Sequence, residues 1–429
     1  MKNYDIYLNP LTFLSQNKWN VREVNKLEYT LFTLQDEIHY LLDSFLTGSS
    51  LTRISKLLYP LVDRNSIALT NISKLLLMLE REHSLPLESS LKLIKNINRG
   101  RSLSPNLLSN IIATLYLEFY NLLRDIKIKR EKYRVEKIRA FVDWNNAVRD
   151  REYLKPVFII KEHFQKNLSK ELKGFYLHGS LSTHDYVKGW SDIDALAIIK
   201  KDVLESNTRL LKFRNSIFRA KSMLYLMDPF QHHGFFTIAE QEMEIYPQYY
   251  FPLELFKFAT SVFDGPEELI FFERNSRIGN VRSFLRIACM LSEMPQRKNL
   301  IPKNTHHWKN YFHLLTLLPC LYLEARGEYY YKKYSFEVAK KDFSKEEWRV
   351  IEKISRIRDN WKLDRIFPEN IEYTLSEFPN PNILLFIYFF KKRKIYDSVS
   401  ADCNLNEIVN ESSILARRMI ENLETEGWL

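Results

Sequence analysis

The sequence predicts an α+β fold in which a small mixed sheet lies between two helical regions. Three stretches carry this prediction. From about residue 26 to 139, apolar residues recur every three to four positions, which is the helical period. After about residue 153, short apolar segments alternate with loops, and five of the ten glycines fall between Gly174 and Gly265. Helical periodicity returns from about residue 280 to the end.

These changes of pattern divide the chain into a helical N-terminal region, residues 1–150, an α/β unit, residues 151–275, and a helical C-terminal domain, residues 276–429. Residues 124–139 contain eight Lys or Arg and three Asp or Glu. We expect this basic stretch to be the solvated face of a long helix, and a nucleic-acid-binding surface is the alternative.

Composition limits the class of protein. Of 429 residues, 45% are hydrophobic and 27% are charged, so the chain can bury a core and is expected to fold. The formal net charge of +10 favours partners that carry phosphate groups.

Cysteine use and hydropathy suggest the compartment. The three cysteines form no CxxC pair, so neither a disulfide framework nor a zinc site is indicated, and a reducing cytoplasm is expected. The longest apolar run, residues 383–390, has eight residues, whereas a bilayer span needs about 20. With no apolar segment at the amino end either, we expect neither secretion nor a membrane partner.

A short strand and a glycine turn open the informative part of the sequence. Residues 174–178, GFYLH, are predicted to form a buried strand, and Gly179 and Ser180 follow where a turn would lead into a helix or loop. Such a turn directs backbone N–H groups at one point, and glycine lets a phosphate approach closely. The Ser180 hydroxyl adds a further hydrogen-bonding group at that point.

Two aspartates stand at the start of the next predicted strand. In SDIDALAII the period of two places Asp192 and Asp194 on one face. Two carboxylates so close repel each other, and a divalent cation would relieve the repulsion. Mg²⁺ is the natural candidate, with Mn²⁺ as its substitute, because it is commonly held by one or two carboxylates together with substrate phosphates.

The order strand, Gly179-Ser180, polar loop and Asp192-x-Asp194 resembles the signature of the DNA polymerase beta-like nucleotidyltransferase superfamily. The resemblance covers about residues 155–275. It implies a palm-like domain in which Asp192 and Asp194 bind divalent metals that carry a nucleoside triphosphate. It also implies that Gly179 and Ser180 hold the triphosphate while an acceptor hydroxyl attacks the α-phosphate.

The resemblance implies a third carboxylate on a neighbouring strand, and here the sequence departs from the pattern. The next strand candidate, residues 231–238, could place His233 or His232 in that position, and an imidazole suits proton removal near neutral pH. His233 is our choice for a general base. The acidic alternatives are Asp228, Glu240, Glu242 and Glu244, and the last three share one face if their segment is extended.

A second cluster lies in the C-terminal domain. The stretch RGEYYYKKYSF carries Lys332, Lys333 and Ser335 in a context that resembles the triphosphate-binding lysine and serine of related enzymes. We expect Lys333 and Ser335 to contact the nucleotide. The adjacent tyrosines, residues 329–331, could offer a ring on which a base stacks.

These features predict a metal-dependent nucleotidyltransferase that moves a nucleoside monophosphate from an NTP to a hydroxyl acceptor and releases pyrophosphate. The basic charge makes RNA or tRNA the favoured acceptor. Small-molecule or protein nucleotidylation and a catalytically silent NTP-binding regulatory module remain alternatives. The sequence leaves the NTP, the number of nucleotides added and the oligomeric state open.

Overall fold

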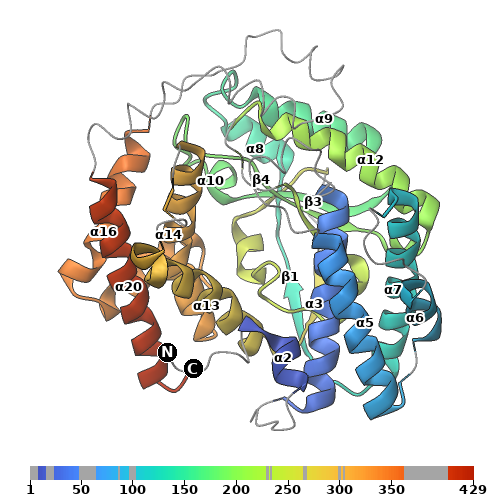
Figure 1. Cartoon of the computed structure of the whole chain (residues 1–429). Helices are drawn as coiled ribbons and strands as arrows, with labels where there is room; N and C mark the ends of the chain where they lie inside the picture. The colour runs from blue at the N-terminus through green and yellow to red at the C-terminus, as the bar shows by residue number, and fades with distance from the viewer. Residues whose placement is uncertain are drawn as a thin grey trace.

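The structure is a computed structural model, and it describes residues 8–15, 24–47, 64–85, 87–95, 103–228, 231, 234–263, 268–297, 301–302, 305–361 and 404–429. The fold is α+β, as the sequence predicts, with a small mixed sheet and helices on either side of it. In the view of Figure 1 the C-terminal helices stand at the left and the first helices of the chain stand at the right.

The N-terminal helices lie where the apolar periodicity places them. They are α2 (Pro10–Ser15), α3 (Lys26–Thr47), α5 (Arg64–His83), α6 (Glu88–Lys95) and α7 (Pro105–Asp125). The start of α7 has a local cause, since the Ser104 side chain accepts a hydrogen bond from the Leu107 backbone N–H at 3.2 Å and Pro105 occupies the first turn.

The basic stretch 124–139 does not continue the helix, so this part of the prediction is wrong. Helix α7 ends at Asp125, and strands β1 (Glu131–Val135) and β2 (Arg139–Ala140) follow. The apolar residues after Asp125 alternate with charged ones, first Ile126 and Ile128 and then Tyr133 and Val135. That period of two suits a strand with one buried face and outweighs the helical propensity of the lysines and arginines.

The main sheet has five strands in the order β2-β6-β3-β4-β5. Its longer strands are β3 (Leu172–His178), β4 (Asp194–Ile199) and β5 (Phe236–Ala239), and β6 (Thr260–Ser261) lies beside β3. Strand β4 is antiparallel to β3 and parallel to β5. A separate two-stranded ribbon pairs β1 with β7 (Leu269–Glu273) in antiparallel register.

The two faces of the main sheet belong to different cores. Phe175, Ala195 and Ala197 pack into a core shared with the N-terminal helices and with α9 (Lys155–Asn167) and α12 (Asn207–Leu224). These two helices lie over the sheet at the top of Figure 1. Leu196 and Ile198 point to the opposite side, into a smaller core with the inner face of the ribbon. Short elements join these parts: α8 (Phe141–Ala147), α10 (Gly179–Thr183), α11 (Lys201–Leu204), η1 (Glu240–Glu244) and η2 (Leu253–Phe258).

The C-terminal helices build a third core. They are α13 (Arg277–Glu293), α14 (Thr305–Ala325), α15 (Lys332–Ala339), α16 (Lys345–Asp359) and α20 (Leu405–Thr425), with short turns η3 (Met294–Gln296) and η4 (Lys340–Asp342). Trp190, from the loop before β4, is buried in this core. Among the helices that the structure describes, none is long and apolar enough to cross a membrane. The apolar run 383–390 lies outside the described residues.

Candidate functional site

The glycine turn and the second aspartate are in direct contact. Gly179 follows β3 and opens α10 with a φ of +67°, a conformation that L side chains rarely adopt. Its neighbour His178 pairs with Asp194 across β3 and β4. A Cβ atom at position 179 would overlap the Asp194 carboxylate, so only glycine lets α10 begin beside this side chain.

The two aspartates differ in setting. Asp194 is the first residue of β4 and is half-buried, whereas Asp192 precedes the strand and is only 6% exposed. The prediction that both lie at the start of this strand therefore needs one adjustment, because the ladder begins at Asp194. Asp192 belongs to the end of the loop that starts after α10.

Ser180 connects the glycine turn to that loop. Its hydroxyl donates a hydrogen bond to Ser191 Oγ at 3.0 Å, and Ser191 Oγ accepts a second one from the Val187 backbone N–H at 2.9 Å. Ser191 is the residue immediately before Asp192. The Ser180 side chain thus helps to fix the position of Ser191 and, through it, of the backbone at Asp192.

Helix α10 is anchored from the side of β2 and β6. The Arg139 guanidinium donates to Thr260 Oγ1 at 3.0 Å and also contacts Ser182 on α10. The Trp144 indole donates to the Leu181 carbonyl at 3.1 Å. These contacts, with side chains from β2, β6 and α8, fix the helix that carries Gly179 and Ser180.

A lysine of the C-terminal domain approaches the two carboxylates. Lys332 opens α15 and is half-buried. Burial lowers the pKa of its ammonium group, and the negative charges of Asp194 and Asp192 partly oppose that shift. Its side chain therefore belongs to the same electrostatic environment as the aspartate pair.

Lys333 and Ser335, the two residues that the sequence favours, lie differently. Lys333 is exposed and pairs with Asp185 at 3.1 Å. Ser335 is buried and donates a hydrogen bond to the Lys332 carbonyl at 2.6 Å. The sequence favours the second lysine of the pair, whereas in the structure the first, Lys332, interacts electrostatically with the two aspartates.

Aromatic rings stand beside this lysine. The Tyr331 hydroxyl lies 2.9 Å from Thr183 Oγ1 on α10, and its ring stacks on Phe258 with centroids 4.8 Å apart. Tyr334 lies 5.8 Å from the Tyr331 ring and is 51% exposed. Tyr331, one of the three tyrosines that the sequence offers for stacking, is only 7% exposed, whereas the exposed ring beside it is Tyr334, which the sequence does not single out.

The three glutamates proposed as a third acid lie at the other end of the sheet. Residues 240–244 form the 3₁₀ turn η1 and are not extended, so they do not share a strand face. Ala239, just before them, pairs with Ile199, five residues beyond Asp194 on β4. At 3.3 Å per residue this separation is about 17 Å along the strand, too far for one metal ion to be shared.

Each of these glutamates has a structural partner. Glu240 pairs with Lys173 at 2.7 Å, Glu242 with His39 at 2.9 Å, and Glu244 with Arg124 at 2.9 Å. Strand β5 itself has no acidic residue. Phe236, which pairs with Leu196 and so shares the face of Asp194, carries a ring 5.7 Å from that of His178.

The remaining candidates lie in the connection from α12 to β5. Asp228 is buried and forms an ion pair with Lys309 of α14 at 2.7 Å. His232 and His233 lie outside the described residues. In the described part of the chain there is no group of three or more His, Cys, Asp or Glu side chains that could hold a metal ion.

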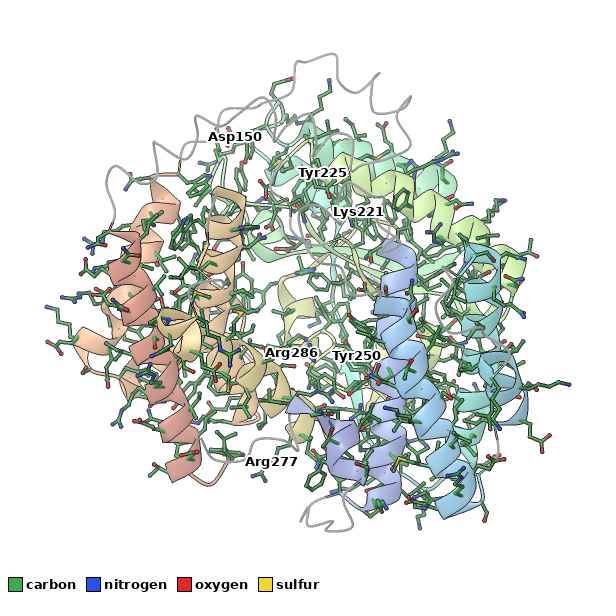
Figure 2. The ribbon with its side chains drawn as sticks, viewed as in Figure 1. Asp150, Lys221, Tyr225, Tyr250, Arg277 and Arg286 are labelled. Atoms are coloured by element: carbon green, nitrogen blue, oxygen red, sulfur yellow. The ribbon has the colours of Figure 1, made fainter. Side chains whose placement is uncertain are left out.

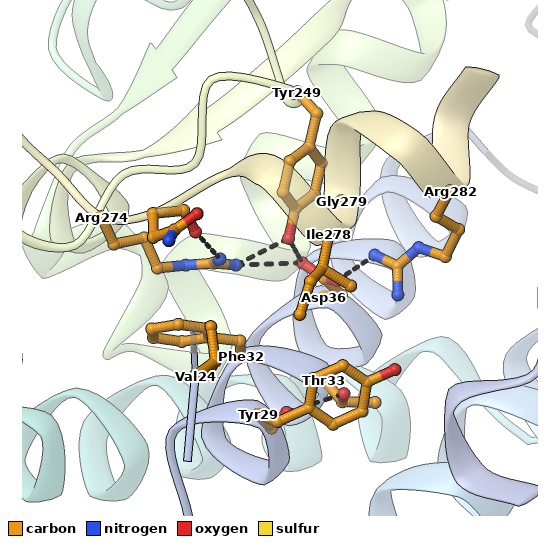
Figure 3. Close-up of a pocket in the computed structure, with 11 residues that line it drawn as sticks. Val24, Tyr29, Phe32, Thr33, Asp36, Tyr249, Arg274, Ile278, Gly279 and Arg282 are labelled. Atoms are coloured by element: carbon orange, nitrogen blue, oxygen red, sulfur yellow. Dashed lines mark hydrogen bonds and ion pairs between the residues drawn. The ribbon is translucent and has the colours of Figure 1, made fainter. Parts of the chain in front are cut away.

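A second polar cluster joins α3 to α13. Asp36 accepts hydrogen bonds from Tyr249 at 2.6 Å and pairs with Arg274 at 3.4 Å and with Arg282, as Figure 3 shows. Burial raises the pKa of Asp36, and the two guanidinium groups more than offset this, so that the pKa lies below its usual range.

This cluster borders a small recess of about 20 Å³. Tyr250 and Arg286 mark the same junction in the middle of Figure 2. Gly279 lets α13 approach, because a Cβ atom there would overlap the Tyr249 ring. Asp36 of α3 forms ion pairs with Arg274, in the segment before α13, and with Arg282 of α13, so we interpret the cluster as a structural link between these parts of the chain.

Comparisons of the chain with protein-family models, with curated proteins and with solved structures find no match.

Proposed function

We propose that this protein is a metal-dependent nucleotidyltransferase whose sheet is a palm-like domain. One observation carries the proposal: Gly179 at positive φ lies directly against the Asp194 carboxylate. This contact gives the Gly-Ser turn and the Asp-x-Asp motif, 13 residues apart in sequence, a common location. It supports a site in which phosphate groups held at the turn meet a cation held by the aspartates.

The donor set fits Mg²⁺ or Mn²⁺. Asp192 and Asp194 supply two oxygen ligands, and such a site is completed by substrate phosphates and water. When bound, the ion would neutralise charge on the triphosphate and on the pyrophosphate leaving group. Ser180 and Lys332 are the residues that we assign to the phosphates, because one adjoins the turn and the other shares the field of the aspartates.

The proposed reaction is a displacement at the α-phosphorus of an NTP. A bond forms between the acceptor oxygen and the α-phosphorus, and the bond from the α-phosphorus to the oxygen that bridges it to the β-phosphate breaks. Pyrophosphate leaves with that electron pair, and the acceptor proton passes to water. The contribution of the chain is chiefly positioning and charge stabilisation.

The outer face of the β1–β7 ribbon favours a polynucleotide acceptor. In the register of the ribbon, Lys132 pairs with Phe272 and Arg134 pairs with Ile270. Phe272 is 40% and Ile270 36% exposed. A cation beside an exposed ring, as in the Lys132–Phe272 pair, suits single-stranded nucleic acid, since the backbone is drawn to the charge and a base stacks on the ring.

The sequence around the ribbon strengthens this assignment. Residues 127–139 carry seven Lys or Arg and two Glu. The same segment leads from the ribbon to Arg139, which contacts α10 next to the Gly-Ser turn. We therefore propose RNA, including tRNA, as the acceptor, with its chain lying along the ribbon and its terminal hydroxyl at the aspartates.

The proposal is tested by incubating the protein with each α-labelled NTP, Mg²⁺ or Mn²⁺ and total RNA, and by separating RNA, protein and small products on a gel. Label in RNA supports the full proposal. Label in protein or in small products would retain the nucleotidyltransferase and reject the acceptor. NTP binding without any transferred label would favour a silent regulatory module.

The role of the ribbon is tested separately by Lys132→Glu and Phe272→Ser. Lys166→Glu on the exposed part of α9 is the matched charge control. Both ribbon variants should weaken RNA binding, and Lys132→Glu should also reduce its salt dependence. Binding that falls equally in the control variant would show that only net charge matters.

A further inference from the structure

The residue between the two aspartates is held by a side chain. Strand β3 pairs with β4 only as far as Asp194, and β5 pairs from Leu196 onward. The buried backbone of Ile193 therefore lies beyond the ladder and needs other partners. Gln231 supplies them: its Oε1 accepts from the Ile193 N–H at 3.2 Å, and its Nε2 donates to the Ile193 carbonyl at 3.2 Å.

This pair of hydrogen bonds imitates a strand residue. A carboxamide that accepts from an N–H and donates to the C=O of the same residue fixes the position and the rotation of that backbone unit. Gln231 is 3% exposed, so water does not compete freely for the two bonds. Because Ile193 is flanked by Asp192 and Asp194, its orientation sets where both carboxylates point.

Gln231 is itself fixed by the C-terminal domain. Its backbone N–H donates to the Asp228 carbonyl at 2.9 Å, and the Asp228 carboxylate forms the buried ion pair with Lys309 at 2.7 Å. The Lys309 ammonium lies 5.3 Å from the centre of the Trp190 ring, which stacks on His313 at 5.0 Å. Helix α14 thus supports the aspartate segment at two points, through Trp190 before Asp192 and through Asp228 and Gln231 beside Ile193.

We infer that Gln231 is a positioning residue for the metal-binding aspartates, held in place by the docking of α14. The inference rests on the proposed function, because it concerns the ligands of the proposed ion. Partners that orient metal ligands typically contribute 10- to 100-fold to metal affinity. Loss of Gln231 should therefore weaken metal binding by that factor without removing any ligand.

Gln231→Leu removes both hydrogen bonds at similar size. Gln231→Glu keeps the acceptor and, when ionised, lacks the donor. Gln241→Leu is the matched control, since Gln241 is also buried but its side-chain amide makes no hydrogen bond with any described residue. The measurement is the Mn²⁺ dissociation constant of the whole protein with NTP, from the electron paramagnetic resonance signal of free Mn²⁺ after subtraction of the Mn²⁺ that NTP binds in a titration without protein, together with the thermal unfolding curve.

We expect Gln231→Leu to raise the Mn²⁺ dissociation constant 10- to 100-fold and Gln241→Leu to leave it unchanged. For Gln231→Glu, the ratio of its constant to that of the wild type should shrink as pH falls from 8 to 5.5 and the new carboxyl gains a proton. If Gln231→Leu does not fold, the pH dependence of the Mn²⁺ dissociation constant of Gln231→Glu, relative to that of the wild type, tests the positioning role instead.

Two results would overturn the inference, and they differ in what else they overturn. Wild-type affinity in folded Gln231→Leu, or a ratio of one at every pH in Gln231→Glu, rejects the positioning role alone. Absence of Mn²⁺ binding in the wild-type protein rejects the proposed function, and the positioning role with it.

Discussion

Replacing Gly179 by alanine tests the contact on which the proposed site depends. Two separate effects follow from the structure. Residue 179 has a φ of +67°, and an L residue in that left-handed region costs roughly 1–2 kcal/mol of folding free energy. In addition, the new Cβ atom would overlap the Asp194 carboxylate, so this side chain must move.

Gly327→Ala separates the two effects. Gly327 has a φ of +78°, and a Cβ atom there would meet nothing within 4 Å. Backbone strain should therefore cost both variants about 1–2 kcal/mol in the free energy of unfolding, measured with urea, and the overlap with Asp194 adds to this loss in Gly179→Ala. Only Gly179→Ala should also raise the Mn²⁺ dissociation constant. We expect a rise of at least 10- to 100-fold, the loss typical when a residue that orients a metal ligand is changed.

The assay combines urea unfolding of each variant with titration of Mn²⁺ in the presence of NTP. Wild-type Mn²⁺ affinity in Gly179→Ala would refute the reasoning, because the displaced carboxylate would then not be a ligand. Equal loss of affinity in Gly327→Ala would assign the effect to backbone strain in general.

Three further outcomes follow from the same geometry. Lys332→Met should raise the NTP concentration needed for transfer about 10- to 100-fold, since a charged contact worth about 1.5–3 kcal/mol is lost. Lys333→Met removes only an exposed ion pair and should change that NTP concentration by at most about fivefold in the same titration. Ser180→Ala loses one hydroxyl contact, worth about 0.5–1.5 kcal/mol, so single-turnover rates at limiting NTP should fall only about 2- to 12-fold. Burial raises the pKa of Glu324 to about 7, so the folded protein keeps a proton there that the unfolded chain releases near pH 4.5, and stability falls as pH rises from about 4.5 to 7. Glu324→Gln should then exceed the wild type by up to about 3 kcal/mol in urea unfolding at pH 8 and match it at pH 4; equal stability of the two at pH 8 would contradict the raised pKa.

The strand and the turn of the proposed site could be predicted from the sequence because local rules determine them. A short apolar run followed by Gly179 and Ser180 predicts a strand and then a turn into a helix or loop, and the structure has β3 followed by α10. The positive φ of Gly179 is a further finding of the structure. The helix predicted for the basic segment after Asp125 is wrong because its charged residues favour helix, while the period of its apolar residues favours the strands that the structure has.

Other parts of the site depend on contacts between distant segments. The alternation of residues 240–244 resembles a strand, yet the Glu242 carboxylate accepts from the Ala239 N–H at 2.7 Å and closes a 3₁₀ turn. His39 and Tyr116, far away in the sequence, hold that carboxylate in place. No local pattern carries this information.

The choice between the two lysines has the same origin. Helix α15 begins at Lys332, directly after Tyr331, whose ring stacks on Phe258 and whose hydroxyl contacts Thr183. In a helix, successive side chains point in different directions, so these distant contacts decide which lysine faces the aspartates. The hydrogen bonds between Gln231 and Ile193 cannot be predicted from a local pattern either, because the two residues are 38 positions apart.

The most direct test of the central claim compares two labels on one nucleotide. Wild-type protein and Asp194→Asn are incubated with RNA, Mg²⁺ and the accepted NTP labelled at either the α- or the γ-phosphate. The account predicts that the α-label enters RNA, that the γ-label appears in pyrophosphate at the same rate, and that Asp194→Asn, although folded, does neither. Transfer of the γ-label to the acceptor, or an undiminished rate in Asp194→Asn, would contradict it.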